Sequence, residues 1–161
     1  MKQILKNYFK LKNFEKLMIL FGILGLFPFI IGLADLYYNF PNLLFEINIP
    51  KNYGVIIFTF LGSLYWGIII QSKKRDSFSN KLKFFTITWS IVPSIFGIII
   101  LSINHSFSII ILILGFTISQ IVDEIYNHIL LFPKWYIIFR RILSFIVIII
   151  LIFSYFIIAK M

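Results

Sequence analysis

The amino-acid sequence predicts an all-α protein, a polytopic bundle of five transmembrane helices. Of the 161 residues, 60% are hydrophobic and only 13% are charged, a composition that does not fit a water-soluble domain of this size. The apolar residues gather in five long runs, and the basic residues gather in the connections between alternate runs. These features indicate a chain whose permanent surroundings are a lipid bilayer.

The five apolar runs are predicted to be membrane-spanning helices. A helix needs roughly 20 residues to cross a hydrocarbon core of about 30 Å, and the fourth run is the shortest. Each run must be helical, because backbone groups inside hydrocarbon need hydrogen-bond partners within their own segment. A β-barrel would show alternating apolar and polar residues, which residues 108–115 and 145–153 do not. The predicted spans cover residues 17–34, 53–71, 82–102, 107–122 and 137–159.

The basic residues predict the orientation of these spans. Lysine and arginine in short connections are retained on the cytoplasmic side during insertion. Thirteen of the fifteen basic residues precede the first span or follow the second and fourth, and only Lys51 and Lys160 fall on the opposite side. We therefore expect the N-terminus inside and the C-terminus outside, in a bacterial inner membrane. Because this placement explains the net charge of +9, nucleic acid is not expected as a partner.

One domain is expected, preceded by a basic tail. Residues 1–16 interleave lysines with aromatic and aliphatic side chains, which suits the membrane surface, and residues 17–161 form the five-span domain. The connection over residues 37–52 is rich in apolar residues and is expected to rest at the membrane interface. The connection over residues 103–106 is short, so the third and fourth spans are expected to form an antiparallel hairpin.

Small residues and prolines indicate where the helices meet. Small residues let helices approach closely in lipid, so packing is the leading interpretation for Gly22, Gly25, Gly32, Gly62 and Gly67. Pro28 and Pro93 each remove a helical hydrogen bond and are expected to kink their spans. In an alternative interpretation these kinks frame a cavity. The candidate cavity residues are then Pro28, Ser63, Tyr65, Trp66, Trp89, Pro93 and Ser94.

Ionisable residues at the inner ends of the fourth and fifth spans form a second candidate site. A charge at membrane depth is costly and is usually paired or functional. Asp123 ends the predicted fourth span and Arg140 opens the fifth on the same side, so we predict an ion pair between them. This pair is interpreted as a structural clamp between the two spans, and the alternative is a role in gating or ion coupling.

The pattern of residues does not indicate catalysis or a metal site. The chain has no cysteine, which excludes thiolate nucleophiles, disulfides and iron–sulfur clusters. His105 and His128 are predicted on opposite sides of the membrane and cannot share a metal. Asp123 and Glu124 are adjacent and point in different directions on a helix, so they do not form a paired acid and base. We therefore predict a non-enzymatic protein without metal or cofactor.

Four segments in order resemble a known family: LGLFPF at residues 24–29, YGVIIFTFLGSLYWG at 53–67, WSIVPS at 89–94 and FPKWYIIFRR at 132–141. The chain is similar to domain-of-unknown-function family 3429, whose animal members are called transmembrane protein 69. The resemblance implies a small multi-span protein of bacterial or mitochondrial membranes without an established activity. Tyr65 stands where the family often has histidine, so proton handling by that histidine is not implied here. The recurrent family positions correspond to Pro28, Gly62, Trp66, Gly67, Pro93, Asp123, Trp135, Tyr136 and Arg140.

Three functions of different classes stay open. The first is a non-enzymatic partner or assembly protein that associates with the lipid bilayer and with other membrane proteins or itself. The second is a carrier or pore for a small solute or proton, acting as an oligomer around the candidate cavity. The third is an enzyme acting on lipid or quinone, with a headgroup site formed by Asp123, Trp135, Tyr136 and Arg140. We favour the first, because the sequence contains no sharper chemical signature.

Overall fold

The structure, a computed structural model, confirms the all-α bundle with five spans. It describes residues 12–38, 49–71, 78–103, 105–130 and 132–160, without the side chains of residues 105 and 128–130. Five helical stretches in this part of the chain are long and apolar enough to cross a membrane, and the first, Asn13–Tyr38, combines α2 and α3. The helices are α2 (Asn13–Leu24), α3 (Phe27–Tyr38), α4 (Ile49–Gln71), α5 (Asn80–Ser102), α6 (His105–Leu130) and α7 (Lys134–Ile158).

Some predictions concern segments outside the described residues. These segments are residues 1–11 of the basic tail, 39–48 of the connection assigned to the membrane interface, and 104 in the short turn. The remainder of the tail, from Asn13 onward, belongs to α2. The tail and the first span are therefore continuous over residues 13–24.

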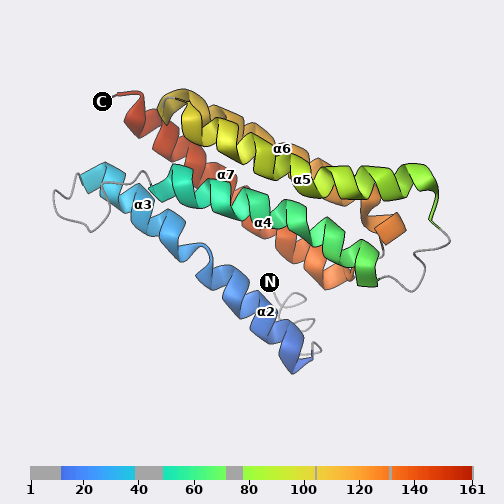
Figure 1. Cartoon of the computed structure of the whole chain (residues 1–161). Helices are drawn as coiled ribbons and strands as arrows, with labels where there is room; N and C mark the ends of the chain where they lie inside the picture. The colour runs from blue at the N-terminus through green and yellow to red at the C-terminus, as the bar shows by residue number, and fades with distance from the viewer. Residues whose placement is uncertain (1–11, 39–48, 72–77, 104, 131, 161) are drawn as a thin grey trace.

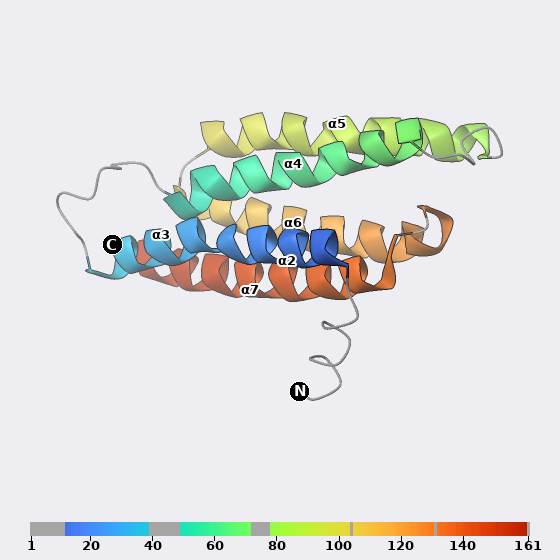
Figure 2. The same ribbon diagram turned by 90° about the horizontal axis from the view of Figure 1, so that it is seen from below.

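The spans alternate in direction, so their ends collect at two opposite ends of the bundle (Figures 1 and 2). The start of α2, the ends of α4 and α6, and the starts of α5 and α7 lie together, and we call this the basic end. A chain that alternates in this way collects the residues of every second connection at one end. The described basic residues at or near the basic end are Lys12, Lys16, Lys81, Lys83, Lys134, Arg140 and Arg141.

Helix α4 is the centre of the bundle, because it contacts α3, α5, α6 and α7. Its most extensive contact is with α5. On another side, the rings of Phe58 in α4 and Phe116 in α6 lie 5.9 Å apart within the buried core. The expected hairpin partners α5 and α6 do contact each other, but each packs more extensively on another helix, α5 on α4 and α6 on α7.

The two prolines that are expected to kink their spans, Pro28 and Pro93, affect their helices differently. The first span is interrupted at Gly25 and Leu26, the third and second residues before Pro28, as a residue without a backbone N–H predicts. The carbonyl of Gly25 accepts a hydrogen bond from the Tyr53 hydroxyl of α4 at 3.1 Å, which satisfies a backbone group at the interruption. Helix α5, in contrast, runs through Pro93 as one element. A proline here does not divide the helix in two.

Three of the five glycines predicted for packing lie where another helix comes close. A Cβ atom added to Gly22 would lie 2.6 Å from the Phe139 ring, and one added to Gly32 would lie 2.6 Å from Pro50 Cδ. A Cβ atom on Gly62 would lie 2.7 Å from Pro93 Cγ, so the missing side chain makes room for the proline ring of α5. Pro50 and Pro93 are rigid rings that cannot rotate away.

The other two glycines have different surroundings. At Gly25 the nearest atoms are carbonyl oxygens of the preceding turn, and the Tyr53 hydroxyl lies 3.8 Å from the added Cβ. At Gly67 an added Cβ would meet no atom of the described residues within 4 Å. Gly67 therefore takes no part in the described packing within this chain.

Lys51 caps the C-terminal end of α5, which lies opposite the basic end. Its side chain is buried, and Nζ donates hydrogen bonds to the carbonyl oxygens of Leu101 at 3.3 Å and Ile103 at 2.9 Å. The last carbonyls of a helix lack intrahelical partners and carry partial negative charge. The lysine supplies both a hydrogen-bond donor and a compensating charge, so it serves packing inside the bundle.

We expect Gly62→Ala to destabilise the bundle and Gly67→Ala to leave it intact. The first substitution forces a methyl group against the Pro93 ring, and overpacking of this kind costs about 1–3 kcal/mol. The second places a methyl group in open space and replaces glycine by a better helix former. Unfolding in mixed detergent and denaturant measures both variants against the parent chain. Equal stability of the two variants would contradict the packing of α4 on α5.

Candidate functional site

A buried carboxylate joins three helices near the basic end. Asp123 of α6 is only 4% exposed. Its Oδ1 accepts a hydrogen bond from the Tyr65 hydroxyl of α4 at 2.6 Å, and its Oδ2 accepts one from Arg140 Nε of α7 at 3.0 Å. The predicted ion pair between Asp123 and Arg140 is confirmed. The Asp123 carboxylate thus links α6 to α4 through Tyr65 and to α7 through Arg140.

Two serines complete the coordination of the arginine. Arg140 Nη1 donates to Ser144 Oγ at 3.1 Å, and Nη2 donates to Ser119 Oγ at 3.2 Å. Ser119 precedes Asp123 by four positions on α6, and Ser144 follows Arg140 by four on α7. Residues four apart lie on the same face of a helix. Ser119 and Asp123 of α6 therefore face Arg140 and Ser144 of α7. These four side chains and Tyr65 form a polar network, and all five are buried.

The network lies about one turn inside the end of the fourth span, Ser106–Asn127, near the basic end. Helix α6 continues to Leu130, beyond the predicted end of the fourth span at residue 122, so Asp123 lies within the helix. In a low-dielectric interior, removing one partner of such a pair leaves an unpaired charge and costs about 3–5 kcal/mol. The network is thus a strong constraint on which faces of the three helices meet.

A second ion pair lies beside the first and faces outward. Glu124 follows Asp123 and Arg141 follows Arg140, and the Arg141 guanidinium donates from both Nε and Nη2 to the Glu124 carboxylate. Gln120 Nε2 also donates to Glu124 Oε1 at 3.0 Å. The Arg141 side chain is 57% exposed, so this pair is at the surface. Adjacent carboxylates therefore point in different directions, as predicted, and have separate partners.

Trp135 and Tyr136 lie at the start of α7, next to the polar network. The ring of Phe132 stacks on Tyr136 at 5.4 Å and meets the Tyr65 ring edge-on at 6.2 Å. Trp135 and Tyr136 line an open groove of about 330 Å³ that also reaches Phe14, Glu15, Met18, Leu64, Ile68, Phe132 and Pro133. Asp123 and Arg140 are buried outside this groove, so the four residues of the predicted headgroup cluster are near one another but do not share one open site.

The candidate cavity residues are not brought together. Tyr65 is buried against Asp123, whereas Ser63, Trp66 and Ser94 are exposed on the outer surface of the bundle. Trp89 is half-buried and stacks on Phe85, which in turn stacks on Tyr126. Pro28 is half-buried in α3, and Pro93 is packed against Gly62. These side chains therefore face different directions.

Sequence reasoning missed three members of the network. From the sequence, Tyr65 is a candidate for a cavity and not a predicted donor to Asp123, and Ser119 and Ser144 have no predicted role. The spacing of four between Ser119 and Asp123, and between Arg140 and Ser144, was a usable signal, because it repeats the same polar face on two neighbouring helices. Nothing comparable in the sequence pairs α4 with α6.

The fold and the network define a small multi-pass helical membrane protein with a charged clamp inside one end of its bundle. Residues 14–156 match the model of the family described as "Protein of unknown function (DUF3429)", and the chain belongs to that family. The resemblance found in the four sequence segments is thereby confirmed. Comparisons with curated proteins and with solved structures give no match.

We expect Asp123→Asn and Arg140→Gln each to destabilise the bundle by about 3–5 kcal/mol, because each leaves one buried charge without its partner. The double substitution removes both charges and is expected to cost less than the sum of the single effects. Unfolding of the three variants in mixed detergent and denaturant gives the coupling between the two side chains.

The outward pair provides the matched control. Glu124→Gln, Arg141→Gln and their double variant neutralise a carboxylate and an arginine one position along, at the surface, where ion pairs contribute little. Their effects on stability are expected to be much smaller than those of the buried pair. Additive effects at Asp123 and Arg140, or equal losses for the two pairs, would show that the buried pair does not clamp the helices.

Proposed function

We propose that the protein is a non-enzymatic component of the membrane that acts by binding a transmembrane helix of another membrane protein. The observation that carries the proposal is the contrast between the two sides of α4. Towards the bundle, Tyr65 and Gly62 are used in contacts with other helices of the chain. Away from the bundle, Ser63 and Gly67 are small and exposed, and a Cβ atom added to Gly67 would meet no atom of the described residues within 4 Å.

The outward face of α4 has the chemistry of a helix-docking surface. Ser63 and Gly67 are four residues apart and lie on the same side of the helix. The Ser63 hydroxyl donates to the Phe60 carbonyl at 2.7 Å, so it is satisfied within its own helix. Trp66 is 51% exposed beside them, and residues 52–71 contain no charged side chain. An apolar helix is the partner that fits such a face.

Glycine at position 67 is best explained by a partner helix. In an exposed helix interior, glycine costs about 1 kcal/mol relative to alanine, and the described packing of the chain gains nothing from it. Association between helices in lipid depends on close approach of backbones at small residues. Gly67 lets a helix of a second protein come close to α4, as Gly62 lets Pro93 of α5 come close.

The contacts between helices support this role over the carrier and the enzyme. Gly62 of α4 lies directly against Pro93 of α5, at the level of the candidate cavity for a solute. The buried ionisable groups of the network, Asp123 and Arg140, already have partners within the chain. Both features suit a permanent scaffold. The proposed membrane is the bacterial inner membrane, with the N-terminus and the basic end inside.

The proposed orientation predicts the behaviour of reporter fusions. Alkaline phosphatase, which is active only outside the cytoplasm, is expected to be active when fused after Lys160 and inactive when fused at Ser79, between α4 and α5. The reason is that the basic residues described above cluster at the end that contains Ser79. A fluorescent protein that folds only in the cytoplasm gives the reciprocal pattern. The reverse result for both reporters would exclude this orientation.

The partner is tested by site-specific photo-crosslinking in native membranes. A photoreactive residue at position 67 is expected to form an adduct with one other membrane protein, identified by mass spectrometry. The same residue at position 102, exposed on α5 at the opposite end of the bundle, is the control and is expected not to capture it. Gly67→Leu should release this protein while the abundance of the chain is unchanged, since position 67 is open in the bundle.

Each outcome of this experiment bears on the proposal. A single adduct at position 67 that Gly67→Leu abolishes supports it. Adducts formed only with a second copy of this chain would contradict it in favour of self-association, and adducts formed only with lipid would exclude a partner on this face. Ser102→Leu adds the same bulk elsewhere and should release nothing.

A further inference from the structure

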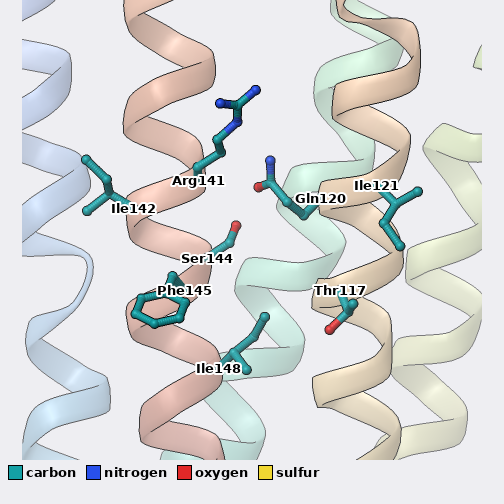
Figure 3. A pocket seen from close by; sticks show the side chains of 8 residues that line it. All are labelled: Thr117, Gln120, Ile121, Arg141, Ile142, Ser144, Phe145 and Ile148. Atoms are coloured by element: carbon teal, nitrogen blue, oxygen red, sulfur yellow. The ribbon is translucent and has the colours of Figure 1, made fainter.

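A second open groove lies between α6 and α7 on the outer surface of the bundle (Figure 3). Its volume is about 510 Å³, within the roughly 300–1,000 Å³ of small-molecule sites. Its walls are mainly the apolar side chains of Ile121, Phe145 and Ile148. Arg141 and Gln120 lie at one end of the groove, and Thr117 and Ile148 lie at the other.

The polar end of the groove is lined by Arg141 and Gln120, and both are bound to Glu124 beside it. The Arg141 guanidinium donates to the Glu124 carboxylate, and Gln120 Nε2 donates to the same carboxylate at 3.0 Å. Gln120 Oε1 is buried and has no hydrogen-bond partner among the described residues. Figure 3 shows the Gln120 amide reaching from α6 towards α7. A buried carbonyl oxygen without a donor costs free energy, which a ligand with an N–H group would recover.

The groove has the depth and position of a site for one lipid chain. Glu124 lies one turn inside the end of the fourth span, Ser106–Asn127, and so lies near the headgroups. Thr117 lies seven positions earlier on α6, which corresponds to about 10 Å along the helix axis. Half of a bilayer core is about 15 Å thick. The groove therefore runs from the headgroup level about 10 Å into the acyl-chain region of one leaflet.

We propose that this groove binds a phospholipid whose headgroup carries a phosphate and a primary ammonium, as in phosphatidylethanolamine. The phosphate binds Arg141, which is exposed and presents a planar set of donors. The ammonium donates to Gln120 Oε1 and to the Glu124 carboxylate. One acyl chain lies along Ile121, Phe145 and Ile148.

Charge and hydrogen bonding select this headgroup over the other common ones. The ion pair of Arg141 and Glu124 matches a headgroup that carries both charges. A choline headgroup carries both charges but has no N–H group for Gln120 Oε1. A glycerol headgroup has donors, but its net negative charge would lie beside Glu124. The primary ammonium alone satisfies the acceptors while its phosphate remains with the arginine.

The experiment is native mass spectrometry of the full chain, purified and exposed to an equimolar mixture of phosphatidylethanolamine, phosphatidylcholine and phosphatidylglycerol with identical acyl chains. We expect one phosphatidylethanolamine per chain, retained about five-fold over the other two, the ratio that one hydrogen bond of ordinary net strength supplies. Gln120→Leu and Arg141→Gln should remove the preference. Gln71→Leu makes the same glutamine change, and Lys134→Gln removes one positive charge, at exposed positions outside the groove, and both should keep the preference.

A third variant separates the groove from the surface around it. Thr117→Trp fills the apolar end of the groove and leaves Gln120, Glu124 and Arg141 in place, and it should lower retention of all three lipids. Equal retention of the three headgroups by the parent chain would overturn the proposal and indicate surrounding lipid only. So would a preference that survives Gln120→Leu, or retention unchanged by Thr117→Trp. Thermal unfolding of each variant checks that the bundle is intact.

Discussion

The ion pair of Asp123 and Arg140 is the constraint on which the rest of the bundle depends. Two opposite charges inside hydrocarbon are tolerated only when they remain together and their remaining hydrogen bonds are satisfied. Ser119, Ser144 and Tyr65 supply those hydrogen bonds. Apolar side chains can slide past one another at little cost, whereas this set of partners meets in one register. The pair therefore decides how α4, α6 and α7 are placed.

The same register determines what appears on the outer surface. Once Asp123 and Arg140 face each other, the next residue on each helix is rotated outward, and Glu124 meets Arg141. The surface pair, the position of the Gln120 amide and the polar end of the groove between α6 and α7 are thus consequences of the buried pair. Tyr65 has a similar effect on α4. With its ring directed inward to Asp123, the neighbouring Trp66 is directed outward.

The five spans and the ion pair could be predicted from the sequence, because both can be recognised without knowing how the helices pack. Long apolar runs mark the spans, and two opposite charges at the same depth mark the pair. Tyr65 could not be paired with Asp123 in this way, since α4 is apolar on all sides and its periodicity does not reveal which face is inward. Nor could the sequence distinguish Pro28, where the helix is interrupted, from Pro93, whose ring fits against Gly62.

Gly62 and Gly67 show why a residue type alone does not identify a docking face. Both occur in the same apolar stretch of α4, but the space beside Gly62 is filled by Pro93, whereas no atom of the described residues lies within 4 Å of a Cβ added to Gly67. The buried network belongs to the stability of the bundle, which leaves the outer surface for association. The proposed helix-docking face is on α4, and the proposed lipid groove is between α6 and α7. Because they are built on different helices, a bound lipid and a partner helix need not compete for the same residues.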